Sequence, residues 1–324
     1  MSNFYLNRRA LLGLALTSAL PANVVWAAGQ PLPVVASFSI LQDLTRQVGG
    51  DRVSVSALVG PDGDAHVFEP TPQQARQLQQ AKVLVANGLD FEGWLPRLKK
   101  ASGFQGQEIV ASQGIAVRSL PKGQGHDHGA GKEGHDHDHD HGNGHHHGPN
   151  DPHAWQDVKN AIAYVRNIAK GLAKADPANA AQYDQQATQY IARLTALDAS
   201  LRQRFAALPA DRRSVVSTHD AFGYFAQAYG LRFVPVRGLS TESEPSARDL
   251  AALVKQVREE RIGAIFVENI SDPRLLEQLA RETGAAIGGR LYSDALSPAG
   301  GPASTYVDMV EANAASLLKA LQAR

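Results

Sequence analysis

The strongest constraint on the fold is a pattern in which short apolar runs alternate with stretches of helical period, once in each half of the 324-residue chain. Strands that alternate with helices predict parallel α/β sheets. The expected strands are residues 33–40, 53–59, 82–86 and 108–111 in the first half, and 214–217, 232–236, 264–267 and 286–291 in the second.

A long helix is predicted between the two halves. Apolar side chains from Tyr183 to Leu201 recur at steps of three and four residues, which is the period of a helix. Asp176 is the expected N-cap and Pro177 the first helical residue, and the helix extends to about Ala207. At about 1.5 Å per residue it is roughly 45 Å long, enough to run the height of two lobes and limit hinge bending. Shorter helices are expected at residues 41–48, 72–80, 94–100, 155–174, 221–229, 246–261, 272–283 and 304–322.

The predicted fold class is therefore α/β, with two lobes that each contain a mostly parallel sheet flanked by helices, joined by one long rigid helix. The expected boundaries are 28–176 for the N-terminal lobe, 177–207 for the linking helix and 208–324 for the C-terminal lobe. Ligands of such sheets bind beyond the carboxyl ends of the strands, so we expect the site in the cleft between the lobes.

Residues 1–27 have the features of a secretory signal peptide. Arg8 and Arg9 precede an apolar run that is too short to span a bilayer, and Ala27 fits a cleavage site. The signal is an ordinary Sec signal or, because of the arginine pair, a twin-arginine signal; a membrane-anchoring helix is disfavoured by the length. The chain has no cysteine, which excludes a lipid-modified N-terminal cysteine. The mature protein is thus expected in the periplasm, starting near Ala28 and not lipid-anchored.

Composition excludes several classes of function. Lys+Arg and Asp+Glu are both 32, so the chain has no basic footprint for nucleic acid. Without cysteine there are no disulfides, thiolate ligands or cysteine nucleophiles.

A low-complexity tract holds nine of the 12 histidines. It is almost entirely His, Asp and Gly, so it cannot bury enough apolar surface to order itself, and we expect a disordered loop at about 122–149. Such tracts bind metals loosely. The auxiliary low-affinity ligands expected there are His126, His128, His135, His137, His139, His141, His145, His146 and His147.

The other three histidines each lie where a strand or loop gives way to a helix. They are His66 in DAHVFEP, His153 in NDPHAW and His219 in STHDAF. Any one of them alone fits an ordinary core or surface histidine, but the three together indicate a metal site assembled by the tertiary fold. Zn²⁺ favours four tetrahedral ligands, and imidazole suits it better than it suits Ca²⁺ or Mg²⁺. Ligand chemistry alone leaves Cu²⁺ and Ni²⁺ open.

The whole mature chain resembles the zinc- and manganese-binding class of ABC-transporter solute-binding proteins. The matching stretches are DAHVFEP (64–70), NDPHAW (150–155), STHDAFGYFAQAYGL (217–231), STESEPSARDLAALV (240–254), VENISDPRLLEQLARETG (267–284) and LYSDALS (291–297). The resemblance implies that the metal ligands are His66, His153, His219 and Asp294. Without the resemblance, Asp294 would fit a helix N-cap or a turn residue.

The resemblance also indicates the metal. Manganese-binding members tend to have Glu or Asp where this chain has His219, and zinc-binding members often carry a His- and acid-rich loop. Some zinc members use an acidic residue beside the first histidine, but Ala65 stands there, which favours Asp294 as fourth ligand. Glu268 follows an apolar strand and is expected to orient a histidine or its own loop. Glu242 and Glu244 are further acidic candidates that we do not count as ligands.

These observations predict a protein that captures Zn²⁺ with high affinity and delivers it to an ABC-type zinc importer, and not an enzyme. The expected partners are the membrane permease and a periplasmic zinc metallochaperone, the expected state is a monomer, and Mn²⁺, Cu²⁺ and Ni²⁺ are expected to bind weakly. One alternative is a periplasmic zinc buffer, metallochaperone or adhesin without a transporter. Another is a zinc-dependent hydrolase, which the lack of HExxH and Gly-x-Ser-x-Gly motifs disfavours.

Overall fold

The structure is a computed structural model that describes residues 1, 30–119, 150–239, 241 and 245–323. The expected signal peptide apart from Met1, the histidine tract, Glu242 and Glu244 lie outside the described residues. From Pro31 onward the chain forms a single contact unit.

Four parallel strands form the sheet of the first lobe, in the order β2-β1-β3-β4. They are β1 (Leu32–Phe38), β2 (Val53–Val59), β3 (Val83–Ala86) and β4 (Gln107–Val110). The connections contain α1 (Ser39–Gly49) with a 3₁₀ turn at Gly50–Arg52, α2 (Pro72–Gln80) and α3 (Leu95–Ser102). The central strands β1 and β3 are apolar and almost wholly buried, as expected for a parallel sheet that is covered on both faces.

The second lobe repeats this arrangement, with the parallel order β6-β5-β7-β8. Its strands are β5 (Ser214–Ser217), β6 (Arg232–Pro235), β7 (Ala264–Glu268) and β8 (Ala286–Leu291). Its helices are α6 (Gly223–Tyr229), α7 (Ala247–Glu259), α8 (Arg274–Thr283) and α9 (Tyr306–Gln322), with a 3₁₀ turn at Ala210–Arg212 before β5. The predicted two-lobed α/β fold is therefore confirmed.

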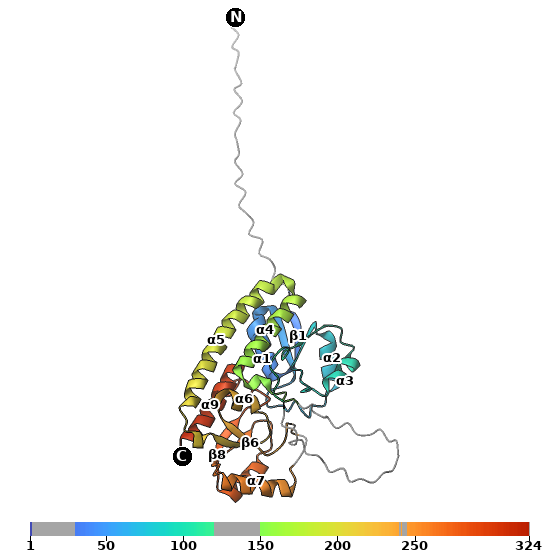
Figure 1. Ribbon diagram of the computed structural model, residues 1–324. Coiled ribbons are helices and arrows are strands. Elements are labelled where there is room, and N and C mark those ends of the chain that lie inside the picture. The colour runs from blue at the N-terminus through green and yellow to red at the C-terminus, as the bar shows by residue number, and fades with distance from the viewer. Residues whose placement is uncertain (2–29, 120–149, 240, 242–244, 324) are drawn as a thin grey trace, which may run out of the picture. The chain divides into compact units, whose positions relative to one another are not determined.

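Helices α4 (Val158–Ala175) and α5 (Ala180–Ala206) connect the two sheets. Helix α5 packs along α4 and also contacts α1, α6 and α9, so it contacts elements of both lobes (Figure 1). The prediction of its start was wrong, because Pro177–Asn179 form a 3₁₀ turn before the α-helix begins. The Asp176 carboxylate accepts hydrogen bonds from Asn179 Nδ2 and Tyr183 Oη instead of capping backbone N–H groups.

Other predicted helices also begin late, and in each case a local or tertiary contact competes with the first turn. Ahead of α4, Ala154–Gln156 form a separate 3₁₀ turn, whose Trp155 and Gln156 side chains both donate to the carbonyl of Ser293 in the second lobe. Asp157 then caps α4 by accepting from the Lys159 amide. Helix α9 begins only after Thr305, whose side chain accepts from the Asp308 amide.

The buried apolar side chains form two clusters. The larger one joins the first sheet, α4, α5, α9 and one face of the second sheet, so the two lobes share one core. The smaller one lies between the second sheet and helices α7 and α8, and it includes Val216, Ile265, Val257 and Leu276. Within the described residues, the structure has no helix with the length and apolar character that a membrane span requires.

Candidate metal centre

Three of the four predicted ligand residues lie shortly beyond the carboxyl ends of strands, and the fourth, His153, lies directly before a 3₁₀ turn. His66 follows β2, His153 lies between β4 and the 3₁₀ turn before α4, His219 follows β5 and Asp294 follows β8. The carboxyl ends of parallel strands meet at one edge of a sheet, and a chain that changes direction there leaves a crevice. Here two such edges face each other, so residues up to 228 positions apart come into contact, as with His66 and Asp294.

The four side chains are fully buried and converge on one point. One ligand atom from each residue can be chosen so that all of them lie within 4.8 Å of one another. Asp294 Oδ2 lies 3.1 Å from both His66 Nε2 and His219 Nε2, and His66 Nε2 lies 3.3 Å from His153 Nε2. Bonds of about 2.0–2.1 Å from Zn²⁺ would place tetrahedral ligand atoms about 3.3 Å apart. The closest pairs therefore already have the spacing of a tetrahedral site.

His153 is oriented by a buried carboxylate. Asp151 Oδ1 lies 2.9 Å from His153 Nδ1 and also accepts the His153 amide, at 3.0 Å. The other oxygen, Oδ2, accepts from Arg118 Nη1 at 2.7 Å. An imidazole that donates from Nδ1 presents the lone pair of Nε2 to the centre of the site, which is what a metal ligand requires.

His219 has an equivalent partner in its own lobe. Glu268, the last residue of β7, accepts the His219 amide through Oε1 at 3.0 Å, and its Oε2 lies 2.5 Å from His219 Nδ1. The expectation that Glu268 orients a histidine is therefore confirmed. The Glu268 side chain thus lies behind His219 and is not one of the four converging groups.

His66 is held through its backbone and its ring. Its amide donates to Asp64 Oδ1 at 2.9 Å, and Asp64 Oδ2 accepts from Thr241 of the second lobe at 2.5 Å. The ring packs edge-on against Phe91 with centroids 4.8 Å apart. Trp94 Nε1 donates to the carbonyl of Ala65 at 2.8 Å, which ties the His66 loop to the residue before α3.

The charges at the centre are strongly coupled. Burial by itself would raise the pKa of Asp294, but the charges of His219 and His153 and the hydrogen bonds that it accepts hold that pKa well below its usual range. Burial would lower the pKa of His219, yet the carboxylates of Glu268 and Asp294 raise it well above its usual value. The pKa of His66 is lowered by burial. In the metal-free protein Asp294 is thus ionised beside a protonated His219, and a bound cation must displace that proton.

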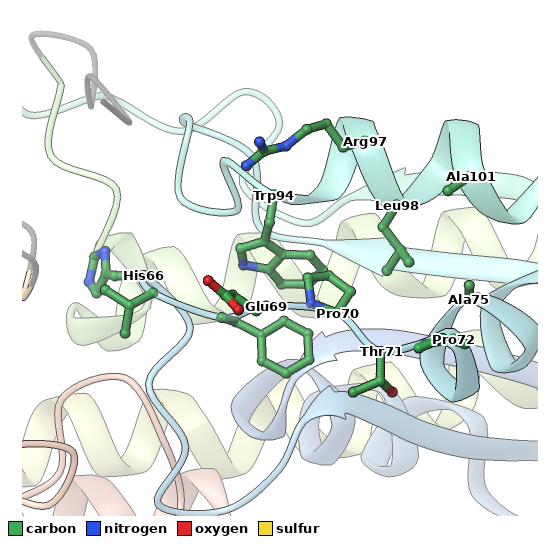
Figure 2. Close-up of a pocket in the computed structure, with 12 residues that line it drawn as sticks. His66, Glu69, Pro70, Thr71, Pro72, Ala75, Trp94, Arg97, Leu98 and Ala101 are labelled. Carbon is green, nitrogen blue, oxygen red and sulfur yellow. The ribbon is translucent and has the colours of Figure 1, made fainter. Parts of the chain in front are cut away.

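A surface cavity borders this centre without containing it. It has a volume of about 610 Å³ and lies between α2 and α3, with Trp94, Leu98 and Pro70 among its walls. Figure 2 shows His66 at one end of the cavity and Ala75 and Ala101 toward the other. Of the four converging residues, only His66 is among those that line the cavity. All four side chains are shielded from solvent. The centre is a closed site for an ion.

The sequence did not reveal Asp151, the partner of His153, or Arg118, the partner of Asp151. Asp151 stands two positions before His153 within the NDPHAW stretch, and that spacing could have marked it as a carboxylate that reaches back to the ring. No local signal pointed to Arg118. Ser119 and Asn150, the neighbours of Arg118 and Asp151 in the chain, form an antiparallel bridge beside that ion pair. The tract histidines themselves lie outside the described residues.

The sequence and the fold both match those of known metal-binding proteins. The profile of the family described as ZnuA, zinc-uptake complex component A periplasmic, matches residues 34–320. The iron-binding protein YfeA of Yersinia pestis is 29% identical over 310 residues, which cover 96% of this chain and 93% of that protein. Several streptococcal relatives are named metal ABC transporter substrate-binding lipoproteins.

Two solved structures have the same fold. The periplasmic zinc-binding protein TroA from Treponema pallidum superimposes with a TM-score of 0.78 at 29% identity, covering 90% of this chain and 99% of that one. A Mn-bound periplasmic metal-binding protein from Candidatus Liberibacter asiaticus has a TM-score of 0.74 at 27% identity, with the same coverage. The relatives are substrate-binding proteins and not enzymes, and their names include iron, zinc and manganese.

Proposed function

Because this chain belongs to the family of periplasmic zinc-uptake complex component A proteins, it is the periplasmic metal-binding component of an ABC transporter, and we propose that its cargo is Zn²⁺. The three converging histidines and Asp294 would be the ligands. The observation that carries this proposal is that four buried groups from both lobes converge, with three of their pairs 3.1–3.3 Å apart.

The ligand chemistry supports Zn²⁺ over harder cations. Three imidazoles and one carboxylate form a nitrogen-rich set, whereas Ca²⁺ and Mg²⁺ prefer oxygen ligands, as does Mn²⁺. His219 stands where manganese-binding members of the class tend to have Glu or Asp. Two of the three imidazoles also have a carboxylate at Nδ1, which makes them stronger donors to a borderline cation.

The formal charge of the centre supports a divalent ion. With the imidazoles neutral, the carboxylates of Asp294, Asp151 and Glu268 and the partly exposed guanidinium of Arg118 sum to a net charge of minus two. A divalent cation neutralises this cluster, and a buried charge is stable only when it is compensated.

Manganese is the second candidate, because related proteins are named for it or were solved with it bound. Both oxygens of Asp294 face the cluster, with Oδ1 at 3.7 Å from His153 Nε2, so a bidentate carboxylate would raise the coordination number. The choice between the two metals therefore depends on measured affinity.

The test compares Zn²⁺ and Mn²⁺ titrations of a variant that lacks residues 126–147, with and without His219→Ala. We expect one tight zinc equivalent, weakened more than about 100-fold in the alanine variant because a direct ligand is worth more than an outer partner. Little Mn²⁺ should bind. Equal or tighter Mn²⁺ binding would assign the protein to manganese, and the absence of a tight equivalent would mean that the four-residue site is wrong.

The histidine tract would serve as a weak collector, or as the place where a periplasmic metallochaperone hands over zinc. Tracts of this composition bind metals loosely. Deleting residues 126–147 should therefore reduce the number of weak zinc equivalents and leave the affinity of the tight one unchanged. Loss of tight binding in the deletion variant would contradict this role.

Delivery of the ion requires the family's usual partners, a membrane permease and its ATPase. We propose that this chain is exported by the signal peptide at residues 1–27 and works as an unanchored monomer, since it has no cysteine to carry a lipid. Labelling with a radioactive fatty acid, together with the oligomeric state of the exported protein by light scattering, tests both statements. Lipid incorporation or a stable dimer would contradict them.

A further inference from the structure

The described structure contains a contact between the lobes directly behind His153. We propose that Arg118, Gly223 and Tyr224 are positioning residues that hold the Asp151 carboxylate against His153, so that the rate of metal release depends on this contact between lobes. The proposal rests on the proposed function, because it assumes that the ion occupies the site of which His153 is part.

The first observation is a chain of short contacts that leads away from the centre. Asp151 Oδ1 lies 2.9 Å from His153 Nδ1, and Asp151 Oδ2 accepts from Arg118 Nη1 at 2.7 Å. The Asp151 side chain is fully buried and that of Arg118 is 27% exposed. The guanidinium is thus the solvent-exposed end of this row of contacts, and it holds the second oxygen of a carboxylate whose first oxygen faces the ring and amide of His153.

The second observation is that the second lobe covers this pair. Tyr224 of α6 accepts the Arg118 amide at 2.8 Å through its hydroxyl, which donates to the carbonyl of Asp151 at 3.2 Å. The Asp151 amide also donates to the carbonyl of Arg118 at 2.9 Å. One tyrosine from the second lobe therefore joins the two backbone segments of the first lobe that carry the ion pair.

The third observation concerns the space at Gly223, the first residue of α6. A Cβ atom placed there would lie 2.0 Å from Arg118 Nη1 and 2.7 Å from Asp151 Oδ2. These distances are far below van der Waals contact, so any side chain at this position must displace the ion pair or move α6. The absence of a side chain at Gly223 is what lets the second lobe pack on the Arg118–Asp151 pair.

Together these contacts make the geometry of His153 depend on both lobes. If the second lobe moves away, the Tyr224 hydroxyl and the wall at Gly223 leave with it. Arg118 then loses the surroundings that direct it to Asp151, and the carboxylate is held only through Oδ1, by the ring and the amide of His153. Outer partners of metal ligands are typically worth about 10- to 100-fold in metal affinity, so this contact is large enough to influence release.

The experiment measures Zn²⁺ release from the full mature chain into excess EDTA, using the slow phase, which reports the closed centre. We expect Gly223→Ala and Arg118→Met to speed release about 10-fold. Tyr224→Phe, which removes one hydroxyl and no volume, should speed it about 2- to 10-fold. Arg118→Lys should restore part of the loss, because it keeps the charge but not the directed fork of the guanidinium.

Two controls separate positioning from general weakening. Arg204→Met breaks an ion pair with Glu311 on α5 and α9 and should leave the release rate unchanged. Long-range ¹H–¹⁵N spectra of the histidine rings should show that His153 loses its fixed tautomer in Gly223→Ala and Arg118→Met, and a purely structural role would not cause that loss. The proposal would be overturned if Gly223→Ala, Arg118→Met and Tyr224→Phe all released zinc at the normal rate with an unchanged His153 signature. Absence of the slow phase in the wild type would instead refute the proposed function.

Discussion

The imidazole ring is oriented differently on the His153 side and on the His219 side of the metal centre. Each imidazole faces a carboxylate that also accepts the backbone amide of the same histidine. Glu268 belongs to the same sheet as His219 and is held inside the second lobe. Asp151 is held by Arg118 and covered by α6 of the other lobe. Glu268 therefore orients His219 entirely within the second lobe, whereas the carboxylate that orients His153 is supported by contacts from both lobes.

The largest effect is expected where the two sides meet, at Asp294. Its carboxylate faces all three histidines and carries the charge that the cation neutralises. Asp294→Ala should weaken Zn²⁺ binding by more than about 100-fold, above the range typical of outer partners. Isothermal titration of the tract-deleted protein measures it, with the exposed Asp184→Ala as control. A change under about 10-fold would show that the three histidines suffice.

The two orienting carboxylates should have effects of similar size but different coupling. Asp151→Asn and Glu268→Gln should each weaken Zn²⁺ binding about 10- to 100-fold. Adding Gly223→Ala should change little in the Asp151 variant, because both act through the same carboxylate, and should add its full effect in the Glu268 variant. Zinc affinities of the two double variants measure this, and Glu277→Gln on the exposed face of α8 is the matched control. Equal coupling on both sides would remove the distinction between them.

The affinity should depend on pH through the His219 side. The pKa of His219 is raised in the metal-free protein, so zinc must displace a proton already at pH values above the ordinary histidine value of about 6.5. While one proton is displaced, affinity should fall about tenfold per pH unit as pH decreases. Calorimetry in buffers of different ionisation enthalpy counts the released proton. A constant zinc affinity down to pH 5 would contradict a three-histidine site.

The raised pKa of His219 changes the stability of the metal-free protein with pH in the opposite direction to the zinc affinity. A raised histidine pKa contributes stability that is fully present below the unfolded value of about 6.5 and is lost as pH rises through the folded pKa. The lowered pKa of Asp294 contributes stability above its unfolded value of about 3.9, and this is lost as pH falls through the folded pKa. Denaturant melts of metal-free and zinc-loaded protein should therefore diverge as pH rises. Parallel curves would argue against the coupled charges.

The smallest effect on zinc is expected from the separate core of the second lobe. Leu276→Ala opens a cavity between the second sheet and α8, which should cost about 2–5 kcal/mol of unfolding free energy. Zinc release should stay within about twofold of the wild type, because this cluster lies on the far side of the sheet from the core that the lobes share. Denaturant melts and EDTA release measure the two quantities. Much faster release would mean that the His219 side of the metal centre is sensitive to packing elsewhere in the second lobe.

Local patterns predicted most of the secondary structure. The strands at 53–59, 214–217 and 286–291 and the helix at 72–80 have the predicted bounds, because alternation and helical period are properties of neighbouring residues. The errors fall at helix starts, where a local turn or a distant group competes for the first residues. Trp155 donates to Ser293 instead of entering α4, and no pattern within 10 or 20 residues contains Ser293.

The ligands were accessible from the sequence for a different reason. Only three histidines lie outside the tract, and each lies where a strand or loop gives way to a helix, which marked His66, His153 and His219 as candidates for a site between the lobes. Asp294 was identified through the resemblance to related proteins, since one aspartate among the acidic residues has no distinguishing local signal. The structure then placed it 3.1 Å from two of the histidines.

The sequence by itself determined the two α/β units, the place of the long helix and the residue types that make a zinc site. These depend on period, composition and strand order, which are read along one dimension. The tertiary structure alone decided which groups stand behind the ligands: Arg118 beside Asp151, with Gly223 and Tyr224 of the other lobe against them. The contacts of Gly223 and Tyr224 join residues of the two lobes that are more than 70 positions apart in the chain. The local sequence does not indicate which distant residues will pack together.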